Sequence, residues 1–131
     1  EVLGGAFPGD AFRCGLFANP GHGNHWLTLR LVGTESPRCG LGAKVCVTVR
    51  EGGQSRSIWR HVGPGASFGG NPLRLELGLG KAERIERVEV TWPRRNAVQT
   101  LTDVPMDALM RVVEGAAKCE RLVVPAAPTH R

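Results

Sequence analysis

The chain has 131 residues, which suits a single domain, and 41% of them are apolar, which is enough to form a hydrophobic core. Its 18 glycines and 9 prolines exceed ordinary usage, so the composition favours many turns and disfavours long helices. The net charge is +5, but no basic run exceeds two residues and only 5% of the residues are aromatic, which disfavours nucleic-acid binding.

The N-terminal segment, residues 1–23, is rich in turn signals and shows no helical periodicity. We expect it to be a linker or the remnant of a preceding domain. The first residue is Glu1, and no charged-then-apolar signal segment follows it. These features lead us to expect that the chain is part of a longer protein.

From residue 25 onward, apolar and polar residues alternate with the period of two that is typical of half-buried strands. In the first such segment, leucines at every second position alternate with Thr28 and Arg30. Turn signals that contain glycine or proline separate most of the further segments. The predicted strands lie at residues 25–31, 44–50, 55–62, 73–79, 85–92, 97–102 and 110–113.

The spacing of these segments predicts an all-β domain over residues 24–115, built as a small antiparallel β-sandwich of six to eight short strands. No helix-length pattern lies between the strands, which excludes a parallel α/β architecture. Residues 116–131 contain one short apolar piece and the sequence Pro-Ala-Ala-Pro at 125–128. We expect this last segment to be a flexible tail.

Two of the three tryptophans are candidates for binding a ligand. Trp92 shares a strand face with Val88 and Val90 and is predicted to lie in the core. Trp26 falls on the face opposite the leucines of its strand, and Trp59 is out of phase with its apolar neighbours, so either can be exposed. An exposed indole packs well on a sugar ring, whereas the competing interpretation is that both cover the core of a second sheet.

His61 and Phe68 complete the candidate ligand-binding set, since His61 lies on a predicted strand and Phe68 in the glycine-rich loop that follows. The sequence contains no Gly-x-Ser-x-Gly elbow, phosphate loop or alternating-aspartate calcium loop, so it assigns no catalytic residue and no cofactor. His22 and His25 form a His-x-x-His pair without an obvious third ligand. Surface or packing roles are therefore favoured for these two histidines, and no metal site is predicted.

The four cysteines, Cys14, Cys39, Cys46 and Cys119, show no Cys-x-x-Cys spacing, which argues against a zinc ribbon or a redox motif. In an oxidising compartment they can form one or two disulfides, and the sequence does not choose among the three connectivities. The alternative is four isolated thiols, of which those on strands pack as small apolar side chains.

Five sequence motifs, taken in order, resemble the ASPIC and UnbV domain. The first combines Asn-His-Trp-Leu at 24–27 with Ser-Pro-Arg-Cys-Gly-Leu-Gly-Ala-Lys-Val at 36–45 and resembles the opening of that domain. The motifs that follow are Gly-Ala-Ser-Phe at 65–68, Gly-Leu-Gly at 78–80, Val-x-Val-x-Trp-Pro at 88–93 and Val-Gln at 98–99. The resemblance covers residues 24–115, which is most of the chain.

The resemblance implies a domain that follows a β-propeller of FG-GAP (VCBS) repeats in secreted or cell-envelope proteins, among them cartilage acidic protein. It implies no catalytic residues, and any calcium would bind in a propeller upstream of Glu1. The implied role is adhesion, recognition or structural packing, with the propeller and a protein or glycan ligand as partners. No stretch approaches the ~20 consecutive apolar residues of a membrane-spanning helix, so we expect no membrane span.

We therefore expect a non-enzymatic accessory or recognition module with Trp26, Trp59, His61 and Phe68 as its ligand-binding residues. One alternative is a carbohydrate-binding module that uses Trp26 or Trp59. Another is an enzyme site that an upstream domain completes, through His25, His61 or the loop at residues 67–68. Convergence of those side chains in one concave pocket would favour the enzyme.

Overall fold

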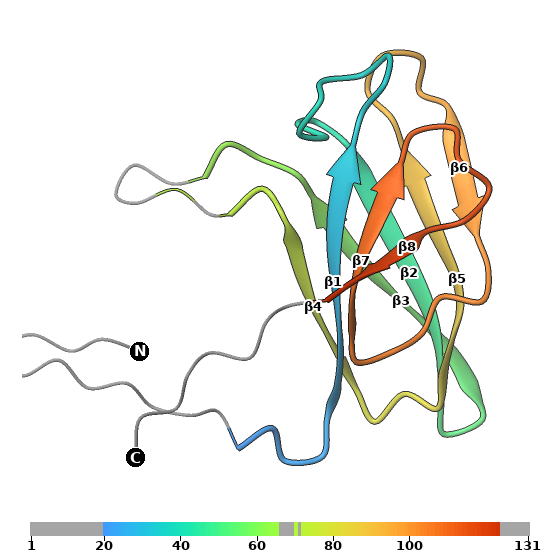
Figure 1. Cartoon of the computed structure of the whole chain (residues 1–131). Coiled ribbons are helices and arrows are strands. Elements are labelled where there is room, and N and C mark those ends of the chain that lie inside the picture. Colours follow the sequence, from blue (N-terminus) through green and yellow to red (C-terminus); the bar gives the residue numbers. More distant parts are fainter. Residues whose placement is uncertain (1–19, 66–69, 71, 124–131) are drawn as a thin grey trace, which may run out of the picture.

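Two four-stranded β-sheets pack face to face in the computed structural model of the chain, which describes residues 20–65, 70 and 72–123 (Figure 1). Sheet A has the strand order β4-β1-β7-β8 and sheet B the order β3-β2-β5-β6, and the described residues contain no helix. The strands, in chain order, are β1 (His25–Val32), β2 (Lys44–Glu51), β3 (Gln54–His61), β4 (Leu75–Gly80), β5 (Arg84–Thr91), β6 (Val98–Leu101), β7 (Ala108–Val113) and β8 (Glu120–Leu122).

The predicted all-β sandwich of six to eight strands is confirmed, but the sandwich is not wholly antiparallel. Strands β1 and β7 run parallel, with Leu27 opposite Ala108 and Val32 opposite Val113, so sheet A is mixed. The chain passes through sheet B between these two strands, and a long crossover of this kind lets the second strand return in the same direction. Alternation reveals a strand and its buried face, but it carries no information about the direction of a neighbour.

Part of the segment predicted as a flexible tail forms strand β8, which pairs antiparallel with β7. Leu122 lies opposite Leu109, and Glu120 lies opposite Arg111. A strand of three residues is too short to show a recognisable periodicity in the sequence. Residues 1–19 and 124–131, which hold most of the predicted linker and the rest of the predicted tail, lie outside the described residues.

Alternation along the strands places one apolar face of each sheet in the core between them. Leu27 and Leu29 of β1 and Val45 and Val47 of β2 are fully buried there. Trp92, which follows β5, is 1% exposed, so its prediction as a core residue is confirmed. Within the described part of the chain, no buried side-chain nitrogen or oxygen lacks a hydrogen-bond partner.

Polar side chains bridge the two sheets at both sides of the sandwich. The carboxamide oxygen of Gln99, on β6, accepts a hydrogen bond from the Trp92 indole at 2.7 Å. The carboxamide nitrogen of Gln99 donates to the carbonyl of Val113, at the end of β7, at 3.0 Å. On the opposite side, the guanidinium of Arg56 on β3 donates to the carbonyl of Leu79 on β4 at 2.9 Å. These bonds join sheet A to sheet B beyond the apolar core.

The carboxylate of Glu114, directly after β7, holds the loop that follows β1. One of its oxygens accepts hydrogen bonds from the backbone amides of residues 34–36 at 2.8 to 2.9 Å, and the other accepts one from the Ser36 hydroxyl at 2.8 Å. Burial opposes ionisation of this carboxyl, but the hydrogen bonds outweigh it and lower the pKa of Glu114 from 4.5 to about 2. The Glu114 amide also donates to the carbonyl of Val32, so a single residue joins the loop to the parallel strand pair.

We predict that Glu114 makes the stability of the fold depend on pH in the acidic range. The unfolded chain protonates this residue near pH 4.5, whereas the folded chain keeps it ionised down to about pH 2. Its contribution to the free energy of unfolding is therefore complete above pH 4.5 and is lost as the pH falls toward 2. Glu114→Gln removes the charge and keeps the shape, and we expect it to lower the free energy of unfolding at neutral pH by about 2 kcal/mol. Urea denaturation across this pH range measures both effects.

Glu83→Gln is the matched control for this experiment. The Glu83 carboxylate is exposed and makes no hydrogen bond or ion pair with the described residues. The control should keep the free energy of unfolding within about 0.5 kcal/mol of the parent chain. Equal stability of the two variants at neutral pH would contradict the role assigned to Glu114.

Candidate functional site

Trp59 and His61 lie on the outer face of sheet B, on its edge strand β3. They are two residues apart, so strand alternation directs both side chains to the same side. Trp59 is 64% exposed, which contradicts the interpretation that it covers the core of a sheet. It lies opposite Cys46 of β2, whose buried side chain belongs to the same outer face. The fold thus brings together two of the four predicted ligand-binding residues.

Trp26 lies on the outer face of sheet A, at the beginning of β1, and is 44% exposed. Asp107 fixes its backbone, since the Trp26 amide donates to the Asp107 carboxylate at 3.1 Å and the Asp107 amide donates to the Trp26 carbonyl at 2.7 Å. The second carboxylate oxygen lies 2.7 Å from Nδ1 of His25, and this hydrogen bond lowers the pKa of Asp107. Trp26 is therefore held on the other layer of the sandwich from Trp59. Phe68 lies outside the described residues.

The two histidines of the alternative enzyme site lie at opposite ends of β4. His25 pairs with Gly80, the last residue of that strand. His61 instead lines a cavity of about 570 Å³ together with Leu75, the first residue of β4. Among the described residues, neither imidazole is hydrogen-bonded to a serine, threonine or cysteine side chain. A catalytic histidine base needs a partner that orients its imidazole, and the Asp107 carboxylate does this for His25. The fold nevertheless does not bring the two histidines into one pocket.

The described residues contain neither a cluster of metal-ligating side chains nor a membrane-spanning helix. In residues 20–65, 70 and 72–123, no group of three or more histidine, cysteine, aspartate or glutamate side chains is placed to hold a metal ion. In the same part of the chain, no helix is long and apolar enough to cross a membrane.

A row of like charges crosses the outer face of sheet A. Arg30 of β1 lies opposite Arg111 of the parallel strand β7. On the other side of β1, Leu29 pairs with Leu75. Continuing that antiparallel register by one residue places Arg74, just before β4, beside Arg30. Like charges directly opposite one another destabilise a sheet, and ion pairs with Glu120 and Glu76 offset part of this repulsion at Arg111 and Arg74.

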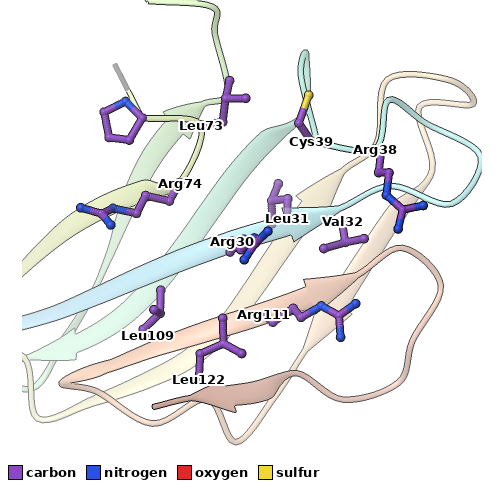
Figure 2. Close-up of a pocket in the computed structure, with 11 residues that line it drawn as sticks. Arg30, Leu31, Val32, Arg38, Cys39, Leu73, Arg74, Leu109, Arg111 and Leu122 are labelled. Carbon is purple, nitrogen blue, oxygen red and sulfur yellow. The ribbon is translucent and has the colours of Figure 1, made fainter. Parts of the chain in front are cut away.

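These arginines line an open groove of about 990 Å³, which we call the arginine groove (Figure 2). Figure 2 shows Arg38 reaching from the loop after β1 toward the end of that strand. Apolar side chains complete the lining, and none of the described residues that form it is acidic. Leu73, Leu109 and Leu122 are among these apolar lining residues.

Two of the four guanidinium groups in the arginine groove are available to a ligand. Arg111 and Arg74 each pair with a glutamate, at 3.0 and 2.9 Å. The side chains of Arg30 and Arg38 are exposed and make no hydrogen bond or ion pair with any described residue. The groove therefore carries unneutralised positive charge over a partly apolar floor.

The arginine groove could not be recognised from charge runs, because its arginines are far apart in the chain and no basic run exceeds two residues. The usable signal is alternation, since Arg30 occupies an outward position of a predicted strand and Arg111 does so in another. That signal identifies outward residues but does not show which strands become neighbours.

Three cysteines are free thiols in different surroundings. Cys39 is exposed and lines the arginine groove, and Cys46 is buried. Cys119 is half-buried, and burial raises the pKa of its thiol. No disulfide joins any two of these three residues, while Cys14 lies outside the described part of the chain.

The family model described as ASPIC and UnbV matches residues 33–119. The chain belongs to this family. The resemblance inferred from five ordered motifs is thereby confirmed. The matched part of the ASPIC and UnbV domain begins directly after β1, contains β2 to β7 and includes Arg38, Arg74 and Arg111. No curated protein matches the chain.

We expect iodoacetamide to alkylate Cys39 before Cys46 and Cys119 in the folded chain. The reaction requires an accessible thiolate, and burial shields Cys46 and disfavours the thiolate of Cys119. Pulse labelling followed by peptide mass spectrometry measures the order. In guanidinium chloride the three rates should become similar, and faster labelling of Cys46 in the folded chain would contradict its placement.

Proposed function

We propose that this ASPIC and UnbV domain is a non-enzymatic extracellular recognition module that packs beside a β-propeller and binds a protein or glycan ligand. The observation that carries the proposal is the exposed Trp59 indole on an edge strand. Tryptophan is enriched among the residues that supply most of the binding energy at interfaces. His61 adds a hydrogen-bonding side chain on the same face of the strand.

The separation of His25 from His61 supports recognition rather than catalysis by these residues. An active site that used both would need them around one concave pocket, and they lie at opposite ends of β4. The propeller partner and the secreted or envelope location rest on the resemblance to domains that follow FG-GAP repeats. In such an arrangement the sandwich is an accessory to the larger domain.

A carbohydrate is the second candidate ligand, and hydroxyl groups near Trp59 favour it. Ser57 lies on the same face of β3, and its Oγ is 3.5 Å from the Oγ of Thr48. The indole offers an apolar surface for a sugar ring, while the exposed Ser57 hydroxyl offers a hydrogen bond to a hydroxyl group of the sugar; Thr48 itself is buried. Trp26 lies on the other layer, so the sugar would contact one tryptophan rather than two.

We expect Trp59→Ala to weaken binding of the protein or glycan ligand by about tenfold or more, because an interface hot-spot residue supplies at least that much affinity. The full chain is first applied to a glycan array and to a panel of extracellular proteins that includes a separately produced β-propeller. Titration calorimetry then compares the parent chain and the variant with each ligand found.

Val98→Ala is the matched control, because Val98 is also an exposed apolar residue of sheet B but lies on its opposite edge strand, β6. It should leave the affinity unchanged. Affinity that depends on Val98 and not on Trp59 would reject the assigned surface. Turnover of a substrate by a chain that binds no glycan and no protein would reject the recognition role itself.

A further inference from the structure

We propose that the arginine groove on sheet A binds an extended acidic peptide segment of a partner protein, one that presents carboxylate and apolar side chains on the same face. The inference rests on the recognition role proposed above, but it uses the outer face of sheet A, whereas Trp59 lies on sheet B.

The charge of the groove selects an anionic ligand. Arg30 and Arg111 are paired on the neighbouring strands β1 and β7, and Arg74 lies just before β4, on the other side of β1. No acidic residue lines the groove among the residues described. The side chain of Arg30 has no partner of its own in the described part of the chain. A ligand carboxylate would accept paired hydrogen bonds from a guanidinium and relieve the repulsion within the row.

The spacing of the row suits an extended peptide that crosses the strands. Neighbouring strands lie about 4.8 Å apart, and alternate residues of an extended chain lie about 6.8 Å apart. The long side chains of Arg30 and Arg111 can span that difference. Every second side chain of such a peptide would then face the groove.

The apolar floor favours a peptide over a purely charged polymer. Leu109 of β7 lies on the same face as Arg111, two residues before it, and is paired with Leu122 of β8. Figure 2 shows both leucines at one side of the groove. Leu73 is 40% exposed at the other wall. Aliphatic side chains of a peptide can pack on these leucines, whereas nucleic-acid bases stack on aromatic rings, and none of the described lining residues is aromatic.

The rim of the groove is held in place before any ligand arrives. Arg38 belongs to the loop after β1, whose amides at residues 34–36 are bound by the Glu114 carboxylate. The carbonyl of Arg38 also accepts a hydrogen bond from the Gly33 amide at 3.2 Å. A fixed loop loses little conformational freedom on binding, which favours affinity.

The test uses the full chain and a fluorescent ten-residue peptide in which every second residue is glutamate or leucine, with both kinds present, and serine stands between them, so that both kinds lie on one face of the extended peptide. Binding is followed by anisotropy. Two comparison peptides replace glutamate by glutamine or leucine by serine. We expect the glutamate–leucine peptide to bind most tightly and its affinity to fall with added salt. Arg30→Glu and Arg38→Glu should each weaken it by about tenfold or more, because each removes a charge-assisted hydrogen-bond donor.

Lys44→Glu is the matched control. It makes the same change of charge at an exposed residue that has no side-chain partner in the described part of the chain, on the outer face of sheet B. It should alter the affinity by less than about twofold. Circular dichroism of each variant verifies the fold, so that a loss of binding reports on the groove.

Several results would overturn the proposal. The first is equal affinity for the glutamate and glutamine peptides. The second is an equal loss of peptide affinity in Lys44→Glu and Arg30→Glu. The third is tighter binding of heparin or DNA than of the acidic peptide. Because Trp59 lies on the other sheet, any of these results leaves the test of Trp59→Ala intact. The two proposals can therefore fail separately.

Discussion

The hydrogen bonds that the Glu114 carboxylate accepts from the loop after β1 tie together the parallel strand pair at the centre of sheet A. Strands β1 and β7 are parallel neighbours with five strands between them in the chain, so no short turn sets their register. Glu114 extends the pair past its last residues and supplies a charged acceptor to three consecutive backbone amides. Those amides point toward one carboxylate, and the depressed pKa of Glu114 reflects how well they solvate it.

Other polar side chains complete the sandwich where the apolar core ends. Gln99 joins β6 to the end of β7, and Arg56 joins β3 to β4. These bridges lie at the two sides, and the core occupies the space between the sheets. The outer faces of the two sheets therefore take no part in joining them and can face solvent or a partner. One outer face carries Trp59 and the other carries the row around Arg30. The two layers of one small domain can therefore differ in the chemistry that they present.

The motifs that identify the family are largely residues that the fold requires. Trp92, in the motif at 88–93, fills the core, and Gln99, in the motif at 98–99, accepts the hydrogen bond from its indole. Gly40, in the opening motif, has φ +71° and lies so close to Leu31 that a Cβ would stand 2.6 Å from the Cβ of that leucine. Such residues can be recognised in the sequence because each meets a local steric or hydrogen-bonding need. They identify the fold, whereas most residues of the proposed ligand-binding surfaces, among them Trp59, Arg30 and Arg111, lie outside these motifs.

The sequence by itself determined the positions of the first seven strands, the buried face of most of them and the core position of Trp92. Those features follow from alternation, which is a local property of the chain. Only the tertiary structure decided that β1 and β7 are parallel, that three residues near the end form β8, and that Trp26 and Trp59 lie on different layers. It also decided that Arg30 and Arg111 meet. These outcomes depend on which distant segments become neighbours, and packing of the two sheets around one core selects those neighbours.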